Sequence, residues 1–342
     1  MNVEEFDYAL PPSLIAQYPP PERGQSRLMV LRRDSGEIRH RAFQDIPEFL
    51  RPGDLLVTNN SRVLPVRLMG QREDGKRCEF LLIPPRNGIQ SVWEALVKDS
   101  KKMKPGTRVR FGEDFYAIVE EVKNGKGKLR FPDTVAVTDH LQETGRIPLP
   151  PYIKREDEPL DRERYQTIFA ENDGSIACPT AGLHFTQDLV LSLRALGVKM
   201  TSITLHVGVG TFAPVRTEQV EEHSMESEWI EISEETRQVI EQTRRMGGRV
   251  IAVGTTTTRA LESFVDRGGH LRSGNGHTSL FIHPPYRFRV VDGLVTNFHL
   301  PKSTLVMLVS AWAGRDVLMK AYLEAVEKKY RFYSYGDAML IL

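Results

Sequence analysis

Residues 250–259 read VIAVGTTTTR, four apolar residues followed directly by a glycine, four threonines and an arginine. A short apolar run bounded by a turn signal is typical of a buried strand. The threonines suit the first turn of a helix, because their hydroxyls can accept hydrogen bonds from its free N–H groups. Leu261 and Phe264 continue that helix as apolar positions. A strand that runs directly into a helix is the repeating unit of α/β folds.

The same alternation extends along the chain on both sides of this segment. Three more helices are expected after residues that suit a helix N-cap, namely Thr186, Ser233 and Ser303. A strand is expected over residues 200–207, and the apolar run 55–57 can join the same sheet. These elements predict an α/β fold with an open, mostly parallel sheet and helices packed on it.

Residues 65–150 have a different character and interrupt that alternation. They read as short strands separated by turn signals such as Asp74-Gly75 and Asn124-Gly125. Short strands at this spacing, with no long helix among them, predict a small barrel or sandwich. We therefore expect a discontinuous α/β domain, residues 1–64 and 151–342, into which a β domain, residues 65–150, is inserted.

Composition excludes several classes of protein. Of the 342 residues, 40% are hydrophobic and 27% are charged, which is an ordinary globular mixture and excludes a disordered chain. The two cysteines, Cys78 and Cys178, are too few for a disulfide framework. The first residues lack the apolar core of a signal peptide, and no apolar run is long enough to span a membrane. We therefore expect a cytoplasmic protein that does not associate with membranes.

Charge is distributed unevenly along a chain whose net charge is +1. Residues 65–131 carry fifteen Lys and Arg against nine Asp and Glu, whereas residues 218–241 carry nine Glu and one Arg. A basic region on a near-neutral chain fits an electrostatic surface for nucleic acid. A solvated sheet face kept soluble by Lys and Arg is the simpler interpretation when charge alone is considered.

Polar residues gather where the expected strands end. Open α/β sheets bind ligands beyond the carboxyl ends of their strands, so these residues are candidates for a site. The clusters are Thr58–Arg62, Pro179–Thr186, His206–Thr211, Gly254–Arg259 and Thr296–His299. Two of them lead into helix starts, where free N–H groups favour a negatively charged group. We expect the five clusters to converge.

The histidines and arginines of these clusters have both a chemical and a structural interpretation. His184, His206 and His299 can transfer protons, although a single buried histidine is more often held by structural hydrogen bonds. Arg62 and Arg259 can hold a carboxylate through two hydrogen bonds, or can form structural ion pairs.

No complete cofactor or hydrolase motif is present. Gly208 and Gly210 follow an expected strand, but G-x-G without a third glycine is a weak signal for a ligand loop. The chain contains no H-E-x-x-H, C-x-x-C, P-loop G-K-[ST] or G-x-S-x-G. These absences argue against zinc hydrolysis, dithiol redox chemistry, P-loop nucleotide hydrolysis and an α/β-hydrolase.

Long ordered blocks of sequence contain most of these clusters. They are FDYALPPSLIAQYP (6–19), SRLMVL (26–31), NNSRVLPVRL (59–68), RIPLPPYI (146–153), RYQTIFA (164–170), PTAGLHFT (179–186), TLHVGVGTF (204–212), GTTTTRALES (254–263), TNFHLPKSTLVMLVSAWAG (296–314) and YRFYSYGDAML (330–340). In these blocks, along nearly its whole length, the chain resembles the S-adenosylmethionine:tRNA ribosyltransferase-isomerase family.

The resemblance implies an α/β domain interrupted by a small β-barrel, and a reaction that makes epoxyqueuosine in tRNA. In that reaction S-adenosylmethionine donates its ribosyl group to a 7-aminomethyl-7-deazaguanine base at the wobble position of tRNAs with GUN anticodons. Adenine and methionine leave. The resemblance implies no metal and no cofactor beyond S-adenosylmethionine as co-substrate. The expected partners are that molecule and the tRNA anticodon stem-loop, and we expect a monomer.

This chemistry suggests roles for the residues of the clusters. His184 and His206 are the first proton-transfer candidates and His299 is a third. Arg259 and the helix start are expected to hold the methionyl carboxylate, and Asn60 and Arg62 the ribose or a base. The substrate-binding residues are expected to be Asn60, Arg62, Thr180, Gly208, Gly210, Thr255, Thr256, Arg259 and Asn297, and the tRNA-phosphate contacts Lys101, Lys102 and Lys104.

The chain departs from the family pattern at a few positions, and two other functions stay open. Glu226 stands where relatives often carry histidine, although Glu228 remains, and Cys178 replaces an alanine. We interpret Cys178 as a packing residue and not as a nucleophile. The other functions are an S-adenosylmethionine-dependent tRNA methyltransferase, which rests on Gly208, Gly210 and the basic insert, and a non-catalytic tRNA-binding module.

Overall fold

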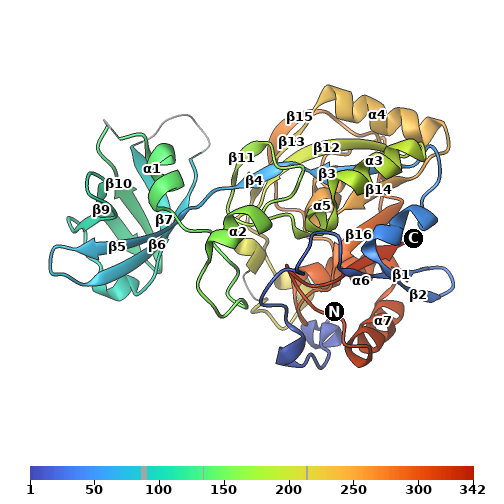
Figure 1. The fold of residues 1–342 in the computed structure, drawn as a ribbon, viewed down its shortest axis with the longest axis horizontal. Helices are drawn as coiled ribbons and strands as arrows, with labels where there is room; N and C mark the ends of the chain where they lie inside the picture. Colours follow the sequence, from blue (N-terminus) through green and yellow to red (C-terminus); the bar gives the residue numbers. More distant parts are fainter. Residues whose placement is uncertain (86–90, 134, 213–214) are drawn as a thin grey trace.

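A nine-stranded open sheet forms the centre of the larger part of the molecule (Figure 1). The structure is a computed structural model that describes residues 1–85, 91–133, 135–212 and 215–342, apart from the side chains of Lys102, Thr211 and Phe212. The strands in spatial order are β15 (Gly274–Thr278), β13 (Glu228–Ile232), β12 (Lys199–His206), β3 (Leu55–Asn59), β14 (Val250–Val253), β16 (Gly293–Asn297), β17 (Ala338–Ile341), β1 (Arg27–Leu31) and β2 (Ile38–Ala42).

The middle of this sheet is parallel, and antiparallel pairs occur toward both ends, although β17 and β1 also pair in parallel. Strands β12, β3, β14 and β16 run parallel to one another, so their carboxyl ends lie along one edge. The early strand β3 joins this sheet, as its apolar run predicted, and lies between β12 and β14. The α/β fold with an open sheet is therefore confirmed.

Both faces of the sheet are buried. Alternate residues of β14 point to opposite sides, with Val250 and Ala252 in one hydrophobic core and Ile251 and Val253 in another. A strand covered on both faces has to be apolar throughout, which explains the unbroken run that begins the VIAVGTTTTR segment.

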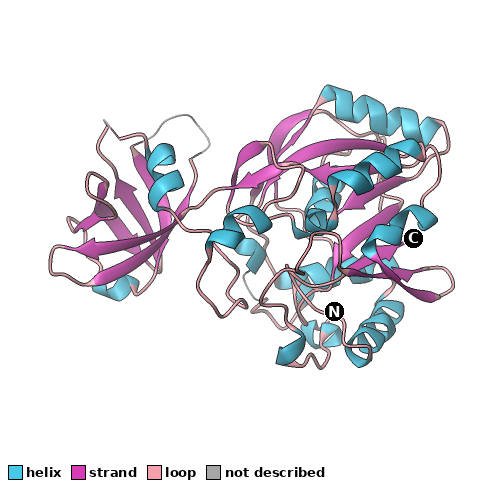
Figure 2. Ribbon diagram, in the orientation of Figure 1, coloured by secondary structure: helices cyan, strands magenta, loops and turns pink. Residues whose placement is uncertain are grey.

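Helices cover the two faces (Figure 2). The three predicted caps are confirmed, because the hydroxyls of Thr186, Ser233 and Ser303 accept hydrogen bonds from backbone N–H groups in the first turns that follow. The α-helices are α1 (Val137–Thr144), α2 (Pro159–Arg164), α3 (Gln187–Ala195), α4 (Glu234–Arg245), α5 (Thr255–Ser263), α6 (Thr304–Ala313) and α7 (Arg315–Glu327). The 3-10 helices are η1 (Val3–Phe6), η2 (Pro12–Leu14), η3 (Phe43–Phe49), η4 (Ser100–Lys102), η5 (Thr180–His184), η6 (Val209–Phe212) and η7 (Val220–Glu222). No helix within the described ranges is long and apolar enough to cross a membrane.

A closed β-barrel stands beside this body, at the left of Figure 1, and confirms the inserted β domain. Its strands in spatial order are β10 (Lys126–Arg130), β7 (Val92–Val97), β6 (Arg77–Ile83), β5 (Arg67–Arg72), β8 (Arg108–Arg110) and β9 (Tyr116–Lys123). Gly70 has to lack a side chain, because a Cβ there would lie 2.4 Å from Cγ1 of Val109. The boundaries at residues 64 and 151 stay a prediction.

The chain enters the barrel through a short two-stranded sheet. Strand β4 (Ser61–Val63) follows β3 after one residue and pairs in parallel with β11 (Asn172–Ser175). This pairing draws the chain away from the large sheet after Asn60, whose N–H still donates to the Ile203 carbonyl of β12.

Candidate active site

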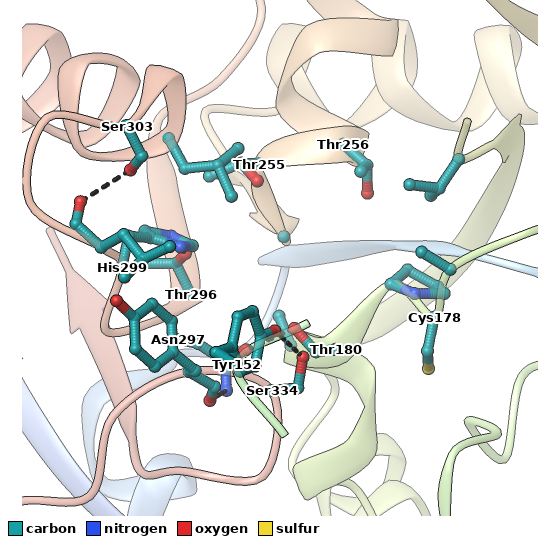
Figure 3. Close-up of a pocket in the computed structure, with 18 of the residues that line it drawn as sticks. Tyr152, Cys178, Thr180, Thr255, Thr256, Thr296, Asn297, His299, Ser303 and Ser334 are labelled. Atoms are coloured by element: carbon teal, nitrogen blue, oxygen red, sulfur yellow. Dashed lines mark hydrogen bonds between the residues drawn. The ribbon is translucent and has the colours of Figure 1, made fainter. Parts of the chain in front are cut away.

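A cavity of about 550 Å³ lies beyond the carboxyl ends of the parallel strands (Figure 3). It is formed mainly by three of the predicted clusters, together with the linker from the barrel and the loop after α7. Its polar lining residues are Tyr152, Cys178, Thr180, Thr255, Thr256, Thr296, Asn297, His299, Lys302, Ser303, Tyr333 and Ser334. The volume falls within the range of small-molecule sites.

The start of α5 forms one wall of the cavity. The N-cap of α5 is Gly254 and no side chain of the described residues caps this helix, so the expected capping by threonine is wrong. The hydroxyls of Thr257 and Thr258 donate to the carbonyls that precede the helix, those of Val253 at 2.8 Å and Gly254 at 3.1 Å. Thr255 and Thr256 instead line the cavity. Oγ1 of Thr256, a residue 8% exposed, has no hydrogen-bond partner in the described part of the chain. Together with the free N–H groups of the first turn, this wall suits a negatively charged group.

His299 lines the opposite part of the cavity, on the loop after β16. Its backbone is held by two tyrosines, because His299 N donates to Oη of Tyr322 at 3.1 Å and Tyr8 donates to the His299 carbonyl. Its Nε2 lies 2.7 Å from Oγ1 of Thr296. Burial lowers the pKa of His299 to about 3, so the ring is neutral at neutral pH. Of the three predicted histidines, this is the one that lines the cavity.

His184 lies behind the cavity wall and reaches it only through Asn297. The Asn297 side chain is oriented by the Tyr333 carbonyl, an obligatory acceptor, to which Nδ2 donates at 3.1 Å. The other Nδ2 hydrogen is donated to Nε2 of His184, 3.1 Å away. Because Nε2 accepts this hydrogen bond, the proton of the neutral His184 ring is on Nδ1, which lies 2.6 Å from Oγ of Ser26. Burial lowers the pKa of His184 to about 4, which agrees with a neutral ring. Thr180 completes the network by donating to Asn297 Oδ1 at 3.1 Å.

Arg259 and His206 lie outside the cavity lining. Arg259 Nη1 and Glu228 Oε2 are 2.5 Å apart, and the two residues are 4% and 3% exposed. The second Glu228 oxygen accepts from Gly208 N at 3.1 Å, so this carboxylate joins the arginine to the glycine loop. His206 stacks on Trp229 with ring centroids 5.0 Å apart. Arg259, which was predicted to bind a substrate carboxylate, is therefore already paired with the carboxylate of Glu228.

The structure does not bring Asn60 and Arg62 to this cavity. Asn60 binds Thr204 at 2.7 Å and Glu171 at 3.1 Å. Arg62 lies on β4, which pairs with β11 outside the large sheet, and it lines a second cavity. The cluster His206–Thr211 reaches the first cavity through Val207, and Gly208 and Gly210 are not among its lining residues. Thus, among the described side chains, three of the five clusters converge as expected, a fourth does so at one residue, and the first does not.

Two lining tyrosines were not predicted. The rings of Tyr152 and Tyr333 stack with centroids 4.4 Å apart, and Oη of Tyr152 lies 2.5 Å from Oγ of Ser334. Tyr333 has φ of 71°, a left-handed conformation that is uncommon for a residue with a side chain. Both tyrosines fall within the blocks RIPLPPYI and YRFYSYGDAML, which is the signal that marked them in the sequence.

The remaining predicted residues have simpler surroundings. Cys178 lines the cavity, and burial raises the pKa of its thiol, which disfavours the thiolate that a nucleophile needs. Lys101 and Lys104 are exposed on the barrel, whereas the side chain of Lys102 lies outside the described part. Where side chains are described, no group of three or more His, Cys, Asp or Glu is arranged to hold a metal ion.

Comparisons with known proteins identify the family. A family model described as queuosine biosynthesis protein matches residues 3–341. S-adenosylmethionine:tRNA ribosyltransferase-isomerases of Pelotomaculum thermopropionicum and Halothermothrix orenii are 53% and 50% identical, with all of each chain covered. A crystal structure of S-adenosylmethionine tRNA ribosyltransferase from Thermotoga maritima is 40% identical, with a TM-score of 0.57 over 99% of this chain and 100% of that one. The chain belongs to the S-adenosylmethionine:tRNA ribosyltransferase-isomerase family of queuosine biosynthesis.

Proposed function

We propose that this chain transfers the ribosyl group of S-adenosylmethionine to a 7-aminomethyl-7-deazaguanine base in tRNA and isomerises it, forming epoxyqueuosine. Full-length similarity to the family supports the reaction. The observation that supports the location of the site is one cavity lined both by a helix start that has no side-chain cap among the described residues and by a neutral histidine. The acceptor is the wobble base of tRNAs with GUN anticodons. The protein works as a cytoplasmic monomer and without a metal.

The methionyl carboxylate binds at the start of α5. The hydroxyl of Thr256 and the free N–H groups of the first turn can both donate to it, and the dipole of the helix favours its charge. Arg259 does not bind the methionyl carboxylate directly, since its guanidinium is already paired with Glu228. Arg259 acts instead as a positioning residue, because its ion pair fixes the loop at Gly208 beside the cavity.

His299 transfers the protons. The sulfonium makes the hydrogens on the ribose 5′ carbon acidic, and a base has to remove one of them. When Nε2–H of His299 donates to Thr296, Nδ1 keeps the lone pair that accepts this proton. The resulting imidazolium can pass the proton to the departing adenine and return to the neutral state that burial favours.

His184 acts through Asn297. Its neutral ring accepts one Asn297 hydrogen and so fixes the side chain whose Oδ1 holds the Thr180 hydroxyl at the cavity wall. In this proposal His184 is a positioning residue, and His206 contributes to packing against Trp229. The linker residues Pro151 and Tyr152 form part of the cavity wall, so the barrel is joined directly to the site.

Replacing Thr256 with valine is expected to weaken S-adenosylmethionine binding by about ten- to a hundredfold, because a hydrogen bond to a charged group contributes about 1.5–3 kcal/mol. Titration calorimetry in the absence of tRNA measures this affinity. Thr257→Val is the matched control, since the Thr257 hydroxyl donates to the carbonyl of Val253 at the end of β14 and does not line the cavity. Equal losses in the two variants, or no loss in Thr256→Val, would place the carboxylate elsewhere.

A further inference from the structure

A second cavity, of about 530 Å³, lies where the barrel meets the α/β body. Gln142 of α1 lines it from the barrel side, Arg162 from α2 and Arg62 from β4. Arg23, from the N-terminal segment, also lines it. Figure 1 shows α2 and β4 between the barrel and the large sheet. Three guanidinium groups from three separated parts of the chain therefore meet at this junction.

Two of these arginines are held by backbone carbonyls and not by carboxylates. Arg23 donates to the carbonyls of Leu183 at 3.2 Å and Gln166 at 3.0 Å. Arg162 donates to the carbonyls of Gln142 at 2.8 Å and Gly145 at 2.5 Å. Carbonyls orient a guanidinium but leave its charge unmatched. Over the described ranges, neither arginine has a carboxylate within 4.0 Å.

The third arginine is matched only weakly. Arg62 Nη2 donates to the Ala170 carbonyl at 2.9 Å, and its Nε lies 3.6 Å from Asp173 in a pair whose side chains are at least half exposed. An exposed pair of this kind contributes little and exchanges readily for another anion. Glu163 and Asp173 are the acids at the cavity, so the three arginines exceed them in charge.

This arginine cavity lies close to the donor cavity. One hydrophobic cluster separates the two, with Val63 and Ile147 facing the arginine cavity and Cys178 facing the donor cavity. A polymer whose reacting base entered the donor cavity would therefore carry its backbone past this junction. Guanidinium groups are well suited to phosphate oxygens, because they donate two parallel hydrogen bonds and are always charged.

We infer that Arg23, Arg62 and Arg162 form a binding site for the phosphodiester backbone of the RNA substrate next to its reacting nucleotide. The inference rests on the proposed function, which supplies RNA as the substrate. Under this inference Arg62 binds a phosphate of the RNA, and not the ribose or base of S-adenosylmethionine. It also places backbone contacts at the junction of the two domains, in addition to those predicted for Lys101, Lys102 and Lys104 on the barrel.

The test measures tRNA affinity by fluorescence anisotropy at several salt concentrations for the wild type, Arg62→Gln and the double variant Arg62→Gln/Arg162→Gln. We expect the double variant to bind about tenfold more weakly at low salt. Each lost phosphate contact lowers the slope of log affinity against log salt by about 0.7 to 0.9. Arg164→Gln is the matched control, because Arg164 is also held by carbonyls, those of Pro20 and Pro21, but does not line this cavity.

Three readouts keep the inference separate from the proposed function. S-adenosylmethionine affinity without tRNA should be unchanged in Arg62→Gln, whereas a loss there would return Arg62 to the donor site and overturn the inference. An active wild type whose salt slope is unaltered in Arg62→Gln and in the double variant would also overturn it. A wild type that binds tRNA but releases no adenine would contradict the proposed function instead. Arg62→Gln removes one hydrogen bond and one exposed ion pair of a half-exposed side chain, so its result stands even where the double variant fails to fold.

Discussion

Replacing His299 with glutamine is expected to slow adenine release by about 10²- to 10⁴-fold, which is the usual contribution of a positioned acid or base. Glutamine keeps a polar group beside Thr296 but cannot carry a proton between two atoms of the substrate. S-adenosylmethionine affinity should change much less, because the α5 wall is untouched. Single-turnover measurement of adenine release separates the chemical step from binding.

The control for this prediction is His206→Gln, a second histidine near a strand end. His206 stacks on Trp229 and does not line the donor cavity, so the same assay should show only a small effect. The opposite ranking, with adenine release lost in His206→Gln and retained in His299→Gln, would move proton transfer to His206 and contradict the assignment.

Replacing Glu228 with glutamine is expected to lower the free energy of unfolding by about 3–5 kcal/mol, because it leaves a buried guanidinium without its counter-charge. Arg259 Nη2 has no hydrogen-bond partner within the described ranges, so no contact of this atom would compensate for the lost carboxylate. Urea unfolding at neutral pH measures the loss. Glu234→Gln is the control, since its pair with Arg237 lies on the surface, where screening leaves little to lose.

The double variant Glu228→Gln/Arg259→Met tests the cause of that loss. Removing both charges takes away the uncompensated ion, so the double variant should recover much of the stability lost in Glu228→Gln. A Glu228→Gln protein as stable as the wild type would show that the buried pair is not a structural requirement. A double variant no more stable than the single one would assign the loss to the Gly208 contact instead.

The sequence predicted those parts of the fold that local signals specify. The strand β14 and the start of α5 follow from four apolar residues, a glycine and a run of threonines, and the caps at Thr186 and Ser303 follow from their hydroxyls. The barrel strands were marked by turn residues. All of these signals lie within a few residues of the elements that they specify.

The parts of the site that could not be predicted depend on distant partners. Arg62 turns away from the sheet because β4 pairs with β11, more than a hundred residues later in the chain. Arg259 is matched by Glu228 because β13 and α5 are brought together. The sequence ranked His184 and His206 before His299, but only the fold shows that His299 lines the cavity and that Asn297 stands between His184 and the cavity. The left-handed backbone of Tyr333 has no signal in the sequence, since it is a tyrosine and not a glycine.

The most direct test of the proposed function is an analysis of the small molecules released from S-adenosylmethionine in the presence of tRNA that carries the aminomethyl-deazaguanine base. Ribosyl transfer predicts adenine and methionine in equal amounts, only when that tRNA is present, with none from tRNA that lacks the base. Release of S-adenosylhomocysteine would show methyl transfer and contradict the proposal. So would folded protein that binds both substrates and releases neither adenine nor methionine.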